Sequence, residues 1–219
     1  MYDQTSYGSN YLHNQASILN KFVNCQPLKH YFSINNAYFC TCVIKRVLNI
    51  YMVKDLIELS NNEHSGFYLH NYDELIAKLI ELDSSGQNVI LIGVTYALLD
   101  LIEKQNFELK NTIIMETGGM KGRRREMIRE ELHQILCVGF GVPSIHSEYG
   151  MTELLSQAYS GQDGFFQAPP WMRIQLRDLY DPLSQVETGA LGAINVVDLA
   201  NIDSCAFIAT DDLGRGAAD

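Results

Sequence analysis

One short stretch of the sequence gathers side chains that could do chemistry. Within five residues it offers an aromatic ring, a flexible glycine, a hydroxyl and a carboxylate, which are Tyr149, Gly150, Thr152 and Glu153. The ring could stack on a base, the hydroxyl could donate to a phosphate, and the carboxylate could hold Mg²⁺. The alternative is an ordinary turn in which Thr152 caps a following helix, and composition alone favours that alternative.

A second stretch, residues 116–125, joins two glycines to a basic run. Gly118 and Gly119 would let the backbone approach a flat ligand closely. The basic residues would then open a helix, where exposed N–H groups favour anions. Acidic residues at 116, 126, 130 and 131 surround this run, so a solvated and charge-balanced helix start is an equal alternative to a phosphate site.

The elements that must position these stretches follow an α/β pattern. Apolar strands at 88–94, 112–115 and 144–147 alternate with amphipathic helices over residues 71–150, which predicts a parallel sheet flanked by helices. A further helix is expected at 43–59. Asn71 and Thr95 are expected to cap the helices that follow them. Ligands bind at the carboxyl ends of strands in such sheets, where both stretches lie.

The pattern changes beyond residue 160. Period-two alternation at 172–178 predicts a half-exposed antiparallel strand, and further strands are expected at 191–198 and 205–210. The fold class is therefore α/β, with a parallel sheet followed by antiparallel strands.

The composition narrows the range of partners. The chain has 219 residues and a net charge of −10, so nucleic acid and anionic membrane surfaces are poor default partners. No apolar run approaches the roughly 18 residues needed for a membrane span. The five cysteines form no C-x-x-C pair, and Cys137 and Cys205 are expected to be core thiols. A soluble cytoplasmic protein is predicted.

The chemical stretches resemble those of a known family. Residues 149–153 match the Y-G-x-T-E motif of adenylate-forming enzymes. The longer blocks METGGMKGRRREMIREELHQIL and IHSEYGMTELLSQAYS resemble more narrowly the LuxE-type acyl-protein synthetases, which are similar in turn to phenylacetate-CoA ligases. The resemblance runs from about Tyr51 to the C-terminus. It implies that the chain is part of the large N-terminal domain of such an enzyme.

The resemblance assigns a nucleotide-binding role to one group of residues. Gly118 and Gly119 would line the adenine pocket through their backbone. Tyr149 would pack on adenine, with Ser147 and Glu148 near the edge of the base. Gly150 belongs to the same cofactor-binding block.

The resemblance places the phosphates and the ribose at three other positions. Thr152 would contact the α-phosphate of ATP, and Glu153 would ligate the Mg²⁺ bound to ATP. These two are the implied catalytic residues. Asp212, in the Thr210-Asp211-Asp212 block, would accept hydrogen bonds from the ribose hydroxyls, although Asp211 stands where the family has glycine.

The implied activity is ATP-dependent formation of an acyl-adenylate from a fatty acid, followed by transfer of the acyl group to a thiol of a protein cysteine or of CoA. Two alternatives stay open. One is an aryl- or acyl-CoA ligase, which shares every visible motif. The other is a non-catalytic, nucleotide-binding remnant of such an enzyme.

Two parts of the family pattern differ here. Residues 1–50 are expected to be a shortened or altered N-terminal segment, because Tyr7 stands where a glycine-rich phosphate loop would need glycine. Residues 51–219 would form a partial adenylate-forming core, without the small C-terminal domain and its catalytic lysine. None of the five cysteines matches the acyl-accepting position. Apolar surface would then be exposed where the absent parts pack, so self-association is an open expectation.

Overall fold

The computed structural model describes residues 38–42, 47–118, 120, 122–125, 127–161 and 164–216. The altered N-terminal segment expected at residues 1–50 therefore lies largely outside the described residues. So do Gly119 and Lys121.

The larger sheet has seven strands in the order β2-β1-β3-β4-β5-β6-β7. Strands β1 to β5 pair in parallel, whereas β6 and β7 are antiparallel. This arrangement, followed by a second antiparallel sheet, confirms the predicted fold class. The strands are β1 (Tyr38–Cys42), β2 (Gly66–Phe67), β3 (Val89–Val94), β4 (Thr112–Thr117), β5 (His146–Tyr149), β6 (Ala158–Ser160) and β7 (Phe166–Gln167).

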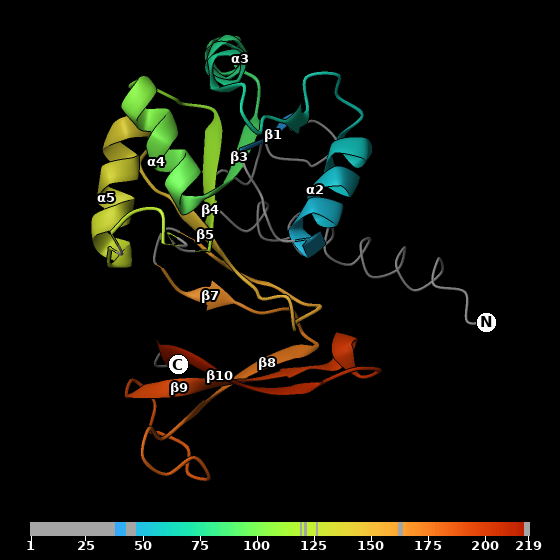
Figure 1. The fold of residues 1–219 in the computed structure, drawn as a ribbon, viewed down its shortest axis with the longest axis vertical. Helices are drawn as coiled ribbons and strands as arrows, with labels where there is room; N and C mark the ends of the chain where they lie inside the picture. The colour runs from blue at the N-terminus through green and yellow to red at the C-terminus, as the bar shows by residue number, and fades with distance from the viewer. Residues whose placement is uncertain are drawn as a thin grey trace, which may run out of the picture.

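Helices cover both faces of this sheet (Figure 1). They are α2 (Val47–Ser60), α3 (Tyr72–Ser84), α4 (Thr95–Lys104) and α5 (Arg129–Phe140). The strand order reverses direction after β2, so right-handed connections put α2 on one face and the other three helices on the opposite face. Among the described residues, no helix combines the length and apolar character that crossing a membrane requires.

The core lies between the central strands and helices α3 to α5. Every residue of β3 and β4 is buried, which explains why both strands are continuous apolar runs in the sequence. On α3, Leu75, Leu79 and Leu82 point into this core, whereas Ile80 is 46% exposed. The face of α3 that packs against the sheet is therefore narrower than the distribution of apolar residues in this helix indicates.

Two expected helix caps differ from the observed ones. Asn71 precedes α3, but its side-chain amide donates to Glu74 and caps no backbone N–H. Thr95 is the first residue of α4 rather than its cap. Its hydroxyl instead contacts the Glu116 carboxylate and the Gly118 carbonyl oxygen, each at 3.2 Å. At Asn71 another local contact has replaced the expected cap, and at Thr95 tertiary contacts have replaced it.

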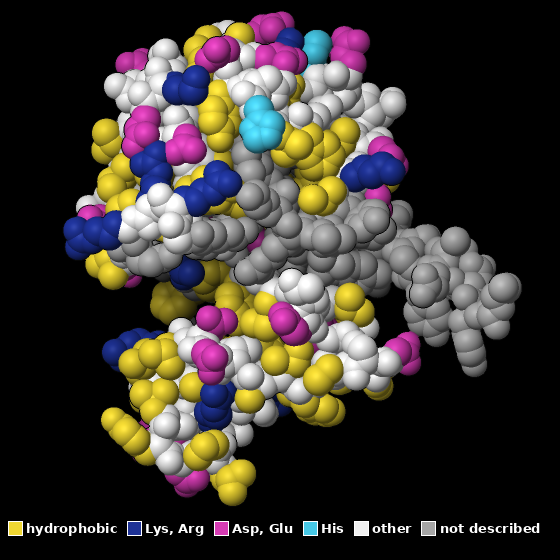
Figure 2. Space-filling view, in the orientation of Figure 1, with side chains coloured by type: hydrophobic (Ala, Val, Ile, Leu, Met, Phe, Trp, Pro, Cys, Tyr) yellow, Lys and Arg dark blue, Asp and Glu magenta, His cyan; other side chains and the backbone are white. Residues whose placement is uncertain are grey.

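A three-stranded antiparallel sheet lies beside the larger sheet and forms the other end of the molecule (Figure 1). It consists of β8 (Met172–Arg177), β9 (Leu191–Asp198) and β10 (Phe207–Arg215), and a short 3-10 helix, η2 (Leu199–Asn201), follows β9. Hydrophobic side chains show on the surface of this part in Figure 2. The β8–β9 connection carries the most exposed of them, Tyr180 and Leu183, at 96% and 97%.

The two cysteines that are expected to be core thiols, Cys137 and Cys205, differ in burial. Cys137 is partly buried against the core, and burial raises the pKa of its thiol. Cys205 is exposed just before β10, so the expectation that it is a core thiol is wrong. The strand that was predicted to begin at Cys205 begins at Phe207 and continues to Arg215.

His146 makes the stability of this fold depend on pH. It is buried at the start of β5, and this desolvation lowers the pKa of its imidazole from 6.5 to about 4. The unfolded chain takes up this proton near pH 6.5 and the folded chain only near pH 4. The free energy of unfolding therefore falls as the pH drops through this interval, by up to about 3 kcal/mol.

We expect His146→Gln to remove this part of the pH dependence. Urea unfolding of both proteins between pH 7 and pH 4.5 measures the slope, which should be shallower for the variant. His70→Gln is the control, because His70 is exposed. Equal slopes for His146→Gln and the unmodified protein would contradict the assignment.

Candidate nucleotide-binding site

The parallel register brings the two chemical stretches of the sequence together. Val94 pairs with Thr117, and Thr117 pairs with Glu148, across β3, β4 and β5. The residues that follow these three are Thr95, Gly118 and Tyr149, so they lie at the same carboxyl edge of the sheet. This is the edge at which open α/β sheets bind ligands.

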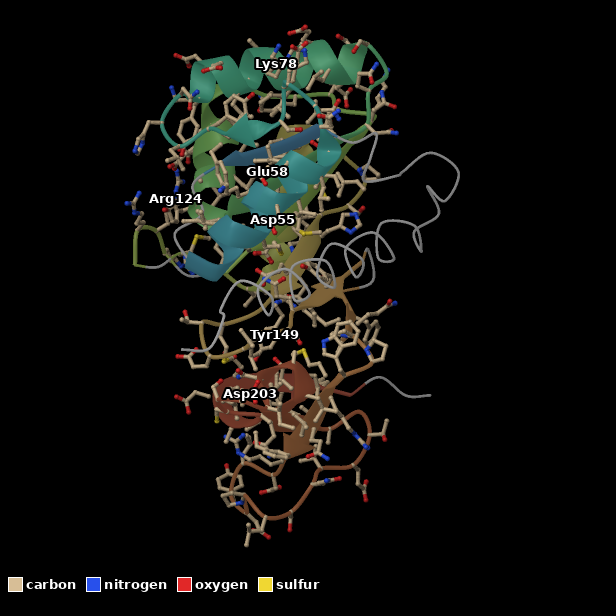
Figure 3. All side chains as sticks on the ribbon, turned by 90° about the vertical axis from the view of Figure 1, so that its right-hand side faces the viewer. Asp55, Glu58, Lys78, Arg124, Tyr149 and Asp203 are labelled. Carbon is tan, nitrogen blue, oxygen red and sulfur yellow. The ribbon has the colours of Figure 1, made fainter. Side chains whose placement is uncertain are left out.

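Tyr149 connects this edge with the three-stranded sheet. Its hydroxyl donates to Asp212 Oδ2 at 2.8 Å, although the two residues are 63 positions apart in the sequence. Its ring meets the ring of Phe166 edge to face, with the centroids 6.0 Å apart. Figure 3 shows Tyr149 between the larger sheet and the three-stranded sheet. The structure thus brings together the residues that the resemblance assigns to adenine and to ribose.

A bulge in β10 directs Asp212 toward this position. Ala209 pairs with Asn195 and Leu213 with Ala193, so β10 carries two more residues than β9 over this interval. The Thr210 hydroxyl supports the bulge, because it accepts from the Asp212 N–H at 3.2 Å and donates to the Ile194 carbonyl oxygen at 3.0 Å.

Thr152 and Glu153 lie in an exposed turn after β5. The Leu154 N–H donates to the Met151 carbonyl oxygen at 3.2 Å, and no helix follows, so the alternative in which Thr152 caps a helix is wrong. The Asn201 amide donates to the Glu153 carbonyl oxygen at 2.6 Å. This contact holds the backbone and leaves both side chains accessible from solvent.

The buried carboxylate of Asp198 holds the other end of this turn. Asp198 ends β9 and is 0% exposed. Its oxygens accept from the Leu155 and Ser156 N–H groups at 3.1 and 2.8 Å, and from the Ser156 hydroxyl at 2.6 Å. Asp198 also accepts from the Ala200 N–H at 3.1 Å, which begins η2. One side chain therefore joins the turn after β5 to the three-stranded sheet.

The remaining predicted residues lie in or next to the strands. Gly118 follows β4 with φ 54°, a left-handed conformation that favours glycine. Ser147 and Glu148 are both buried in β5. A side chain at Gly150 would collide with the Glu148 carboxylate, because a Cβ there would lie 2.4 Å from Oε1. A residue with a side chain at position 150 would therefore have to displace the Glu148 carboxylate.

The basic run does not form a cluster at a helix start. Helix α5 begins at Arg129, several residues beyond the run. Arg124 pairs with Asp100 and Glu103 of α4, and the Arg123 guanidinium lies 4.5 Å from the centre of the Tyr96 ring. These contacts support the charge-balanced alternative for the described arginines.

The described residues contain no group of three or more His, Cys, Asp or Glu side chains that could hold a metal ion by themselves. Glu153 offers an exposed carboxylate next to Thr152, the residue predicted to contact the α-phosphate. That suits Mg²⁺, which is commonly bound through one or two carboxylates together with water and substrate phosphates.

Comparisons with known structures define the class of fold. A 2-hydroxyisobutyryl-CoA ligase structure in complex with 2-HIB-AMP and CoA matches 99% of this chain and 46% of its own, with a TM-score of 0.66 and 10% identity. The adenylation domain of a keto acid-selecting NRPS module matches 93% of this chain and 46% of its own, with a TM-score of 0.56 and 11% identity. The fold is that of adenylate-forming enzyme domains.

One curated protein is related to the chain in sequence. It is the long-chain-fatty-acid–luciferin-component ligase of Aliivibrio fischeri, 24% identical over 154 residues. This relative is the LuxE acyl-protein synthetase, so the resemblance found in the sequence blocks is confirmed. The match covers 66% of this chain and 40% of the relative. No protein-family profile matches the chain.

Sequence reasoning missed the residues that support the motif. Phe166, Asp198 and Asn201 received no role, yet they contact Tyr149, the turn after β5 and Glu153. Of the three, only Asp198 could have been noticed in the sequence, because it is an acidic residue at the end of an apolar strand. The contacts of all three depend on pairings between distant segments.

We expect Asp198→Asn to lower the free energy of unfolding by about 2–4 kcal/mol, because an amide group would face N–H donors in a buried site. Urea unfolding followed through Trp171, the only tryptophan, measures this change. Trp171 Nε1 donates to the Ser156 hydroxyl at 3.0 Å, so its fluorescence reports on the same contacts.

The matched control is Asp203→Asn, which alters an exposed aspartate in the same part of the fold (Figure 3). It should change the free energy of unfolding by less than about 0.5 kcal/mol. Equal effects of the two substitutions would contradict the role given to Asp198.

Proposed function

We propose that this chain binds ATP and activates a carboxylic acid as an acyl-adenylate. The observation that carries the proposal is the hydrogen bond between Tyr149 and Asp212. This hydrogen bond joins the three-stranded sheet to the carboxyl edge of the larger sheet. It also places the ring of Tyr149 beside the carboxylate of Asp212, which can accept hydrogen bonds from ribose hydroxyls. Gly118 borders the same edge with a close-approaching backbone.

The chemistry needs charge stabilisation more than an activated nucleophile. A substrate carboxylate attacks the α-phosphorus of ATP, and pyrophosphate leaves with the bonding electron pair. Thr152 is accessible to donate to the α-phosphate. Glu153 would hold Mg²⁺, which would offset the negative charge that gathers in the transition state.

The substrate we propose is a fatty acid, and the acyl group would then pass to a thiol. The name of the Aliivibrio fischeri relative supports a long-chain fatty acid. The acceptor is either a protein cysteine or CoA, and the structural likeness to a CoA ligase supports the second choice equally. The match spans about 40% of the length of the relative, so its substrate and acceptor come to this chain as proposals.

Binding of a non-hydrolysable acyl-adenylate analogue, measured by calorimetry, tests the pocket without requiring turnover. Tyr149→Ala should weaken binding about tenfold, because base stacking on an aromatic ring contributes about 1–3 kcal/mol. Asp212→Asn should weaken it to a similar extent through the ribose hydroxyls. Tyr149→Phe keeps the ring but loses the hydroxyl that donates to Asp212, so it should weaken binding less than Tyr149→Ala.

Tyr180→Ala is the control, because Tyr180 is 96% exposed in the β8–β9 connection. It should bind the analogue normally. Absence of binding by the unmodified chain, in a sample with a cooperative melting curve, would contradict the proposal. ATP binding without any formation of acyl-adenylate would favour the non-catalytic, nucleotide-binding remnant instead.

The role of Glu153 predicts a specific magnesium dependence. The unmodified chain should bind ATP about tenfold more tightly with Mg²⁺ than without it, and Glu153→Gln should lose most of that difference. The variant should still bind the acyl-adenylate analogue normally, because the analogue carries no pyrophosphate. Glu187→Gln, at an exposed position, is the control. A normal Mg²⁺ dependence in Glu153→Gln would rule out this metal assignment.

A further inference from the structure

A buried polar cluster lies directly beneath the candidate site. Its members are Thr95, Glu116, His133 and Ser147, which come from α4, β4, α5 and β5. Thr95, Glu116 and Ser147 are at most 6% exposed, and the His133 side chain is 19% exposed. None of the four has a role in the proposed chemistry, although Ser147 belongs to the predicted binding block.

The contacts of the cluster centre on the Glu116 carboxylate. His133 Nε2 lies 3.8 Å from Glu116 Oε1 and 3.2 Å from the Ser147 hydroxyl oxygen. Thr95 donates to Glu116 Oε2 at 3.2 Å. Arg129, one helical turn before His133, adds a positive charge that faces Glu116.

These groups hold Glu116 as a carboxylate. Burial alone would raise its pKa, but the neighbouring His133 and Ser147 side chains and the charge of Arg129 outweigh burial and lower the pKa. An ionised Glu116 can only accept hydrogen bonds, as it does from Thr95. Between Ser147 and His133, the tautomer of the imidazole decides which side chain donates.

The cluster reaches the candidate site by three routes. The Thr95 hydroxyl also lies 3.2 Å from the Gly118 carbonyl oxygen. Ser147 is two residues before Tyr149, so the two side chains leave β5 on the same face. The Arg129 guanidinium lies 4.7 Å from the centre of the Phe166 ring, which itself packs against Tyr149.

We infer that Glu116 and His133 are positioning residues for the nucleotide pocket. They contact Ser147, and through Thr95 they reach Gly118, so they set where the adenine-binding edge lies relative to α5. This inference rests on the proposed function. Neither residue contacts a reacting atom, so the effect is on affinity for the adenylate rather than on a chemical step.

Calorimetry with the acyl-adenylate analogue tests the inference in the full chain. Glu116→Gln preserves the shape of the side chain and removes its charge, and should raise the Kd about tenfold. His133→Met removes the ring nitrogen that contacts Ser147 and should have a similar effect. His133→Gln keeps a polar amide group, which can donate or accept, near the Nε2 position, and should restore the Kd to within about threefold of the original value.

Asp83→Asn is the matched control for a buried carboxylate. Asp83 accepts from the Lys110 and Asn111 N–H groups and from the Thr112 hydroxyl at the amino end of β4, whereas Glu116 lies near the carboxyl end of the same strand. The control should lower the melting temperature and leave the Kd unchanged in the folded sample.

The outcomes separate this inference from the proposed function. No binding by the unmodified chain would contradict the proposed function itself. Normal binding by the unmodified chain, with unchanged Kd values in Glu116→Gln and His133→Met, would overturn the positioning role alone. So would the absence of a cooperative melting transition in both variants, because the cluster would then support the fold and not the pocket.

Discussion

The geometry of the candidate site depends on the buried carboxylate of Asp198. The turn after β5 is short and irregular, and within it the Leu154 N–H donates to the Met151 carbonyl oxygen. Asp198 ties this turn to the other sheet, because it accepts from two consecutive N–H groups and a hydroxyl while its own strand belongs to that sheet. A buried charge is stable only when it is fully hydrogen-bonded, and here that requirement fixes the turn.

Asp198 belongs to a wider pattern of buried carboxylates at strand ends. Asp83 accepts from backbone N–H groups where β4 begins, and Glu116 accepts from hydroxyls near its end. Each acidic side chain accepts hydrogen bonds from donors that do not take part in the pairing between strands. The cost of desolvating each charge is offset by charge-assisted hydrogen bonds, which are stronger and more directional than neutral ones. The sheet edges are therefore held in defined positions, as a ligand site requires.

The sequence predicts the central part of the fold well because its signals are local. Strands β3 and β4 are buried on both faces. This burial requires apolar residues at nearly every position, and the resulting uninterrupted run is visible in the sequence. The same holds for the motif residues, which lie next to one another in the chain. β1 was not predicted, because this five-residue strand, with the sequence YFCTC, shows no clear alternation of apolar and polar residues. The bulge in β10 could not be predicted from nearby residues either, because a bulge is defined by how β10 pairs with β9.

The contacts that join the motif to the rest of the molecule are the least predictable part. Thr95 shows why: its sequence position suits a helix cap, but a neighbouring strand presents Glu116 and Gly118 to its hydroxyl, and the tertiary contacts prevail. A Thr hydroxyl has one proton, so it donates to one acceptor at a time. The ionised Glu116 competes with the Gly118 carbonyl oxygen for it, so the charge state of a residue beneath the site bears on the backbone that a nucleotide would contact.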